Sequence, residues 1–182
     1  MTKIAVLVGS LQQKSFNKML ARNLEQLLPE GVEFNYINIG AFPLFNQDLE
    51  ADFPKAVQEA KDIVDAADGV LFVTPEYNRS LPGPLKNAID WISRPWGKNS
   101  FNGKPTGIVG ASPSPIGTAV AQSDLRHIAG FLNVKLMGQP ELYLVNAGNA
   151  FDEEGNIVEA SRDFLKNYIS AFVEWVTREE DK

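Results

Sequence analysis

The sequence contains no cysteine and a single histidine among its 182 residues. The absence of cysteine excludes disulfide bonds, thiolate nucleophiles and cysteine-ligated metal centres. The lone histidine, His127, lies in a helix-forming stretch, where we expect a surface or interface position rather than a catalytic one. We therefore expect neither a metal site nor thiol chemistry.

Long hydrophobic runs and excess positive charge are also missing. The apolar stretch near the N-terminus stops at Gly9, which is too short for a signal sequence or a membrane span. The sequence has 17 Lys and Arg residues and 23 Asp and Glu residues, which gives a net charge of −6. This charge disfavours binding to nucleic-acid phosphates or anionic membranes. These features predict a cytoplasmic protein that neither inserts into membranes nor binds nucleic acid.

Strand-like and helix-like segments alternate along the whole chain. Continuous apolar runs are typical of parallel strands buried on both faces, and the first of them, 4–8, is the expected central strand. The other expected strands with apolar runs cover residues 70–73, 107–109 and part of 134–144, while alternation of apolar and polar residues predicts a strand nearer the edge at 32–36. Helical spacing of apolar residues predicts helices at 19–28, 54–67, 84–93, 117–132 and 164–176. The pattern indicates one α/β domain over residues 1–182, with a doubly wound, five-stranded parallel sheet.

Three loops follow strands at the sheet edge where doubly wound folds bind ligands, namely 9–17, 74–84 and 111–117. The 9–17 loop offers hydroxyls, an amide and backbone N–H groups at a helix N-terminus, which suits a phosphate monoester. The alternative is that Ser15 or Asn17 only caps the helix. After Gly9 the spacing fits neither a dinucleotide fingerprint nor a Walker loop, so an ATPase is disfavoured.

The 74–84 loop is stiffened by three prolines and a glycine. Its backbone groups could satisfy the polar edge of a planar heterocycle while Tyr77 covers apolar area. The alternative is a proline-rich turn before a core helix, with Ile89 and Trp91 serving as packing residues.

Together the two loops resemble the NADPH-dependent FMN reductase family, which includes bacterial quinone, chromate and azo-dye reductases. Residues 9–17 resemble the family's Gly-Ser-x-Arg-x-x-Ser-x-Asn pattern. Residues 75–91 resemble its Pro-Glu-Tyr-Asn flavin loop and the following Leu-Lys-Asn-Ala-Ile-Asp-Trp helix. The similarity extends over nearly the whole chain, including 43–48, 103–105 and 112–117. It implies a flavodoxin-like sandwich.

The resemblance also implies where FMN is held. The phosphate and ribityl chain are expected at the 9–17 loop, and the isoalloxazine ring along 75–80 with its remaining edge at the third loop. Asn78 is the candidate catalytic residue near flavin N5. Gln12 replaces an arginine that many relatives direct at the phosphate, and Arg79 replaces an aromatic residue. The implied cofactor-binding residues are Ser10, Gln12, Ser15, Phe16, Asn17, Pro75, Glu76, Tyr77, Asn78, Arg79, Ser80, Ser112 and Gly117.

By the same resemblance the expected activity is ping-pong hydride transfer, in which NADPH or NADH reduces FMN and a small acceptor then reoxidises it. The acceptor is expected to be a quinone or another small molecule, such as a flavin, chromate or an azo compound. The protein is expected to be a homodimer or homotetramer, with the 43–50 loop reaching a neighbour's flavin site. A flavodoxin-type electron carrier that serves protein partners is the alternative. A serine hydrolase is disfavoured because Gly110-Ala111-Ser112-Pro113-Ser114 lacks the final glycine of a nucleophile elbow.

Overall fold

The structure of the chain, a computed structural model, describes residues 1–180 and contains one parallel sheet. The strand order is β2-β1-β3-β4-β5, with a short β6 also paired to β4. The first four strands are β1 (Thr2–Val8), β2 (Val32–Tyr36), β3 (Gly69–Val73) and β4 (Pro105–Ala111). The expected α/β architecture is confirmed, but β3 rather than β1 is the central strand. The prediction that 4–8 lies at the centre was wrong.

The last strand is divided into β5 (Lys135–Leu136) and β6 (Leu142–Leu144). Both pieces pair in parallel with β4, β5 near its start and β6 at its end. The interruption contains Gly138 and Pro140. Proline cannot donate a ladder hydrogen bond and glycine weakens a strand, so one continuous strand over this stretch is disfavoured.

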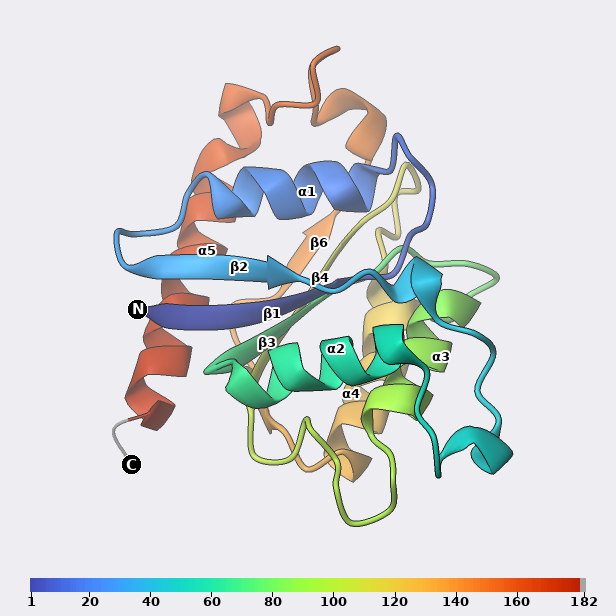
Figure 1. Ribbon diagram of the computed structural model, residues 1–182. Helices are drawn as coiled ribbons and strands as arrows, with labels where there is room; N and C mark the ends of the chain where they lie inside the picture. The colour runs from blue at the N-terminus through green and yellow to red at the C-terminus, as the bar shows by residue number, and fades with distance from the viewer. Residues whose placement is uncertain (181–182) are drawn as a thin grey trace.

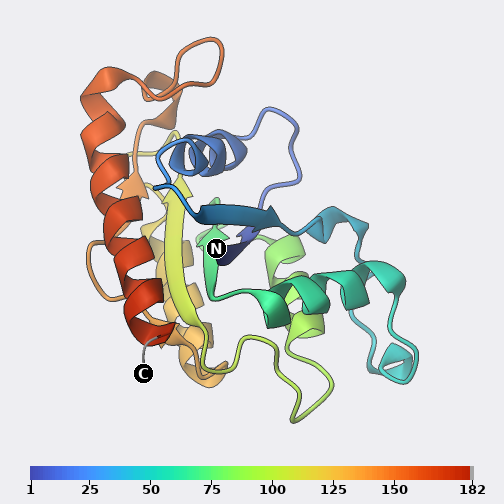
Figure 2. The same cartoon turned by 60° about the vertical axis from the view of Figure 1, so that its left-hand side comes forward.

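Helices cover both faces of the sheet (Figures 1 and 2). Ile4 and Val6 of β1 pack into one core, while the intervening Ala5 and Leu7 pack into the other, as the two-residue period of a strand requires. The first core is covered by α1 (Phe16–Glu25) and α5 (Glu159–Glu180). The second is covered by α2 (Lys55–Ala66), α3 (Gly83–Ile92) and α4 (Ala119–Phe131). Among residues 1–180, no helix has the length and apolar character needed to cross a bilayer.

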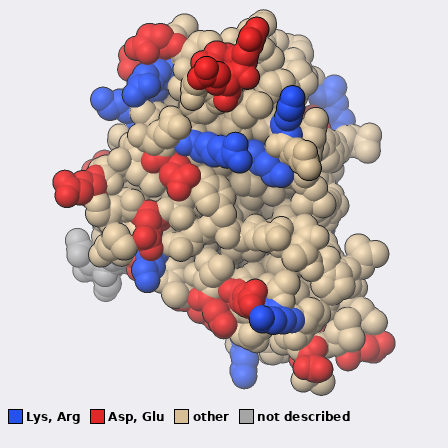
Figure 3. Space-filling view, turned by 45° about the horizontal axis from the view of Figure 1, so that its top comes forward, with Lys and Arg blue, Asp and Glu red and all other residues tan. Residues whose placement is uncertain are grey.

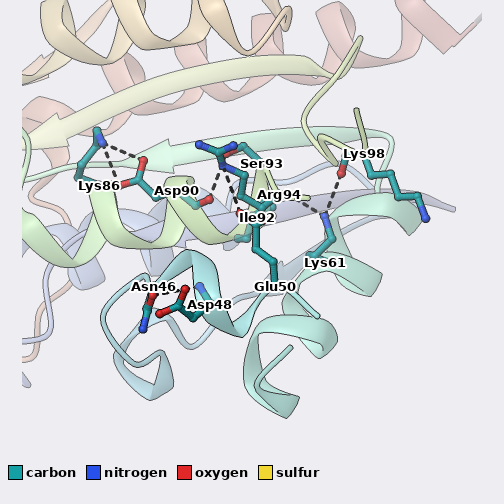
Figure 4. Close-up of polar contacts among 10 residues, drawn as sticks. All are labelled: Asn46, Asp48, Glu50, Lys61, Lys86, Asp90, Ile92, Ser93, Arg94 and Lys98. Atoms are coloured by element: carbon teal, nitrogen blue, oxygen red, sulfur yellow. Dashed lines mark hydrogen bonds and ion pairs between the residues drawn. The ribbon is translucent and has the colours of Figure 1, made fainter. Parts of the chain in front are cut away.

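The segment between β2 and α2 contains the short helices η1 (Ile39–Ala41) and η2 (Gln47–Leu49) and lies against α3. The Pro43 carbonyl accepts hydrogen bonds from Trp91 Nε1 at 2.8 Å and Asn87 Nδ2 at 2.9 Å. Asn87 Oδ1 accepts from the Phe45 N–H at 2.7 Å. Figure 4 shows Arg94, just beyond α3, directed at Glu50 of the same segment. A third short helix, η3 (Ala147–Asn149), precedes α5.

Lys61 is a buried lysine that joins α2 to the chain after α3 (Figure 4). Its Nζ donates to the carbonyls of Ile92 at 2.9 Å and Lys98 at 3.1 Å, and to Ser100 Oγ at 2.7 Å. Burial lowers the pKa of this ammonium, because leaving water disfavours the charged form. The three acceptors offset part of that cost.

Candidate functional site

Three loops meet at the carboxyl ends of the adjacent strands β1, β3 and β4. Gly9, which begins the first loop, lies directly against the second. A Cβ atom at Gly9 would stand 2.9 Å from Pro82 Cγ and 3.1 Å from Pro75 Cδ. Only glycine therefore lets the loops after β1 and β3 approach this closely.

The first loop presents backbone donors at the start of α1. Ser15 is the helix N-cap, and its Oγ accepts from the Asn17 N–H at 3.2 Å. Within residues 1–180, the backbone N–H groups of residues 10–14 have no hydrogen-bond partner. The bond from the Asn17 N–H to Ser15 Oγ confirms the capping role of Ser15. The unpaired N–H groups at a positive helix end suit a phosphate group.

Asn17 joins the first loop to the third. Its side chain is 2% exposed and exchanges two hydrogen bonds with the backbone of Ala111, at the end of β4. Both polar atoms of the amide are thereby occupied by protein. The structure gives Asn17 a positioning role, and direct contact between this side chain and FMN stays a prediction.

Two other predicted residues of the first loop differ in their surroundings. The Phe16 ring stacks on Phe151, with centroids 6.1 Å apart and planes 11° apart, so it anchors the start of α1 to the core. Gln12 is exposed at the loop surface. Ser10 is buried, and its Oγ lies 3.5 Å from the hydroxyl oxygen of Tyr77 in the second loop.

The second loop is a tight hairpin turn. Tyr77 and Ser80 exchange both backbone hydrogen bonds at 3.1 Å, and the two central residues, Asn78 and Arg79, have φ of 53° and 61°. This is the geometry of a type I′ turn, in which asparagine is well tolerated. A left-handed arginine costs about 1–2 kcal/mol. The turn holds the Asn78 side chain at an exposed tip.

Glu76 connects the second loop to α4. Its Oε2 accepts from the backbone N–H groups of Val120 at 3.0 Å and Ala121 at 3.2 Å, in the first turn of that helix. Its Oε1 pairs with Arg79 Nη1 at 3.2 Å. Both oxygens of this nearly buried carboxylate are therefore used within the protein. Glu76 was expected along the isoalloxazine ring, and the structure shows that it caps α4.

The third loop is shaped by Ser112 and Gly117. Ser112 Oγ accepts from the Ser114 N–H at 3.1 Å, and the Ser112 N–H donates to the Leu144 carbonyl at 3.0 Å. Gly117 has φ of 67°, and a Cβ there would stand 3.1 Å from Val145 Cγ1. Both the backbone conformation and the space therefore favour glycine.

Sequence reasoning missed Asp124 and Thr74 as supports of the second loop. Ser80 Oγ donates to Asp124 Oδ2 at 2.6 Å, which fixes one end of the hairpin turn to α4. The hydroxyl of the fully buried Thr74 donates to the Pro75 carbonyl at 2.7 Å. Asp124 lies 44 residues beyond its partner, so no local spacing signals the pair.

Comparison with known proteins shows the family to which the chain belongs. A family model described as NADPH-dependent FMN reductase matches residues 2–149. The chain belongs to the NADPH-dependent FMN reductase family. It is therefore an oxidoreductase, and the cofactors of its family are FMN and a nicotinamide nucleotide. The flavodoxin-like fold expected from the loops is confirmed as well.

Relatives and solved structures agree with this assignment. The chain is 49% identical over 175 residues to the 2-hydroxy-1,4-benzoquinone reductase of a Burkholderia species, covering 96% of each chain. It is 42% identical over 174 residues to a quinone reductase of Pseudomonas putida, covering 95% of this chain and 94% of the relative. The chain also resembles the solved structure of FerB, a flavoenzyme NAD(P)H:acceptor oxidoreductase of Paracoccus denitrificans. The two superpose with a TM-score of 0.92 at 40% sequence identity, and the match covers 98% of this chain and 99% of FerB.

The residues present fit FMN. The unpaired N–H groups of residues 10–14 supply donors for a phosphate, and no metal is needed to hold it. The hairpin turn at 77–80 is held rigidly by backbone pairing and by Glu76 and Asp124, as a support for a planar ring requires. Tyr77, 47% exposed, offers an aromatic surface beside it.

Proposed function

We propose that this chain is a cytoplasmic quinone reductase that transfers electrons from NADPH or NADH through bound FMN. The observation that carries the proposal is the rigid meeting of the three loops at the ends of β1, β3 and β4. Asn17 ties the first loop to the third, and Glu76 ties the second loop to α4. The quinone as acceptor is supported by the names of relatives that are 42–49% identical over almost the full chain.

The chemistry that FMN supplies when bound is the transfer of two electrons from a nicotinamide to an acceptor. The protein has to hold the cofactor and orient its partners. The N–H groups of residues 10–14 would hold the phosphate, and Pro75 and Tyr77 would support the ring. Asn78 presents its amide from the exposed tip of the turn as a hydrogen-bonding group near the reacting nitrogen. The donor and the acceptor would bind in turn beside the 77–80 turn, so the expected kinetics are ping-pong.

The test is steady-state turnover of the FMN-loaded protein with NADPH or NADH and a series of 1,4-benzoquinones. Parallel lines in double-reciprocal plots, obtained when both substrates are varied, are the expected result. A protein that binds FMN and turns over no quinone with either nucleotide would instead act as a flavodoxin-type carrier. Relatives of this chain are named as reductases, which favours quinone turnover over a carrier role.

We propose further that two copies pair through the outer face of α3 and α4, and that such dimers can associate into a tetramer. Trp96 and Phe131 are each 75% exposed, and their ring centroids lie 6.2 Å apart. They border a groove of about 730 Å³ that also contains Ile89 and Ile128. Lys86 and Asp90 on this face pair with each other, with 2.8 Å between Nζ and Oδ1, so their charges do not oppose contact between two copies across a twofold axis.

Phe131→Glu tests this pairing by placing a charge in the apolar groove. Phe164→Glu on α5 is the matched control, because Phe164 is also exposed, at 45%, and lies outside the groove. The expected result in sedimentation experiments is that Phe131→Glu is shifted toward monomer and Phe164→Glu sediments like the wild type. An unchanged mass for Phe131→Glu would contradict pairing through this face.

A further inference from the structure

A second groove, of about 650 Å³, lies beside the first loop and is separate from the α3–α4 face. It is bounded by α1, by the end of β2 and by η1. Its lining is largely apolar, and a few polar side chains stand at its sides. The lining includes Ser10, Leu11, Lys18, Arg22, Glu25 and Tyr36.

Two cations border this groove from α1. Lys18 and Arg22 are four residues apart and so project from the same side of the helix. Within residues 1–180 neither side chain forms an ion pair, although Lys18 Nζ donates to the Leu11 carbonyl at 3.3 Å. Figure 3, which brings α1 forward, shows a band of basic side chains across this face, with acidic side chains beside its left end and uncharged surface below the rest.

Glu25, the carboxylate in the groove, is held by Tyr36. The Tyr36 hydroxyl donates to Glu25 Oε2 at 2.9 Å. Burial and this hydrogen bond raise the pKa of Tyr36, so the phenol remains a neutral donor at physiological pH. The Glu25 carboxylate is thereby bound to the Tyr36 hydroxyl. Lys18 and Arg22 are the groups of the groove that are suited to bind an anion.

The groove leads to the flavin loops. Ser10 lines it, and Ser10 Oγ lies 3.5 Å from the hydroxyl oxygen of Tyr77, which belongs to the 77–80 turn. A ligand with one end in the groove could therefore extend along the first loop toward the turn. An elongated ligand with an aromatic ring and a phosphate matches the apolar lining and the two cations.

We infer that this groove binds the adenosine 2′-phosphate end of NADPH, with the phosphate at Lys18 and Arg22 and the adenine between Leu11 and Tyr36. The inference rests on the proposed function, since it assigns a place to the electron donor of that reaction. NADH lacks the 2′-phosphate and cannot use the two cations. The groove therefore gives the protein a preference for NADPH.

Arg22→Gln tests the inference in the FMN-loaded enzyme, with Arg162→Gln on α5 as the matched loss of one exposed arginine. The ratio of the KM for NADPH to the KM for NADH is expected to rise about tenfold in Arg22→Gln, the effect of losing one charge-assisted hydrogen bond. Lys18→Gln should move the ratio in the same direction. An unchanged ratio, or an equal rise in Arg162→Gln, would overturn the inference.

A binding measurement separates this inference from the proposed function, because it needs no turnover. Calorimetry on the FMN-loaded protein compares 2′,5′-ADP with 5′-AMP. We expect 2′,5′-ADP to bind about tenfold more tightly, with the difference shrinking at high salt and disappearing in Arg22→Gln. Equal affinity of the two nucleotides would overturn the inference, even if the enzyme reduced quinones rapidly.

Discussion

The Asn17 amide and the Ala111 backbone exchange two hydrogen bonds, Nδ2 to the carbonyl and the N–H to Oδ1, each 2.9 Å long. These atoms lie 94 positions apart in the chain and are buried. The pair holds the N-terminus of α1, next to the unpaired N–H groups of residues 10–14, to the strand that leads into the third loop. Asn17 thus fixes the distance between two walls of the proposed flavin site.

Asn17→Ala should therefore reduce the free energy of unfolding as well as FMN affinity. It leaves a buried N–H and a buried carbonyl of Ala111 without partners, at a cost of about 2–3 kcal/mol. Urea denaturation of the FMN-free protein measures this cost directly. Asn35→Ala is the control, because it removes only a 3.3 Å contact to Glu33 near the surface. Equal stability of both variants would show that the Asn17 clamp contributes little.

Gln12→Arg should strengthen FMN binding without affecting riboflavin. Gln12 is exposed beside the unpaired N–H groups of residues 10–14, and an arginine there can add a charge-assisted hydrogen bond to the phosphate. The expected gain is about 1–2 kcal/mol, and it should shrink as salt increases. Fluorescence titration with both flavins measures it. A similar gain for riboflavin, which lacks the phosphate, would mean that position 12 acts on the ring or on the fold.

The sequence predicted much of the fold because burial patterns are local. Apolar runs located β1, β3 and β4, and alternation of apolar and polar residues located β2. Helical spacing located all five helices, although α1 begins earlier and α5 is longer than expected. The central position of β3 could not be read from hydrophobicity, since β1 and β3 are similarly apolar. Gly138 and Pro140 indicate the division of the last strand, because both residue types disfavour a continuous strand.

The supports of the site were less predictable than its loops. The 9–17 and 74–84 loops could be identified from their composition and position after strands. The bonds of Asn17 to Ala111 and of Glu76 to Val120 join residues far apart in the chain, so no spacing rule reveals them. The pair Lys18 and Arg22 had a readable signal, because residues four apart on a helix share a face.

Glu76→Ala should destabilise the protein by about 1–3 kcal/mol, since two N–H groups of the first turn of α4 lose a charged acceptor. Glu76→Gln should cost less, because the amide oxygen can still accept a hydrogen bond. Thermal unfolding of the FMN-free protein gives the order. Glu153→Ala, on an exposed loop, is the control and should change little. If Glu76→Ala matched this control, the carboxylate would have no capping role.

Lys61 should give stability a distinct pH dependence. Burial lowers its pKa, with Asp65 and Asp62 opposing this effect, so the unfolded chain binds the proton more tightly than the folded one. The cost of burying the charge is complete below the lowered pKa and is relieved as pH rises toward 10.5. Lys61→Met lacks this proton, while all other groups titrate in both proteins.

We therefore expect the free energy of unfolding of the wild type to increase relative to that of Lys61→Met as pH rises from about 7 to about 10. Urea denaturation of both proteins across this range measures the difference. A difference that stays constant, or that moves toward Lys61→Met, would show that the ammonium is not held at a lowered pKa.

Anaerobic mixing of the FMN-loaded protein with NADPH, followed by 1,4-benzoquinone, tests the central claim most directly. We expect NADPH to bleach the visible flavin absorbance rapidly, and one equivalent of quinone to restore it and yield hydroquinone without a radical product. NADH should give the same sequence of changes. A flavin that neither nucleotide bleaches, or one that the quinone fails to reoxidise, would contradict the assignment of this chain as an NAD(P)H-dependent quinone reductase.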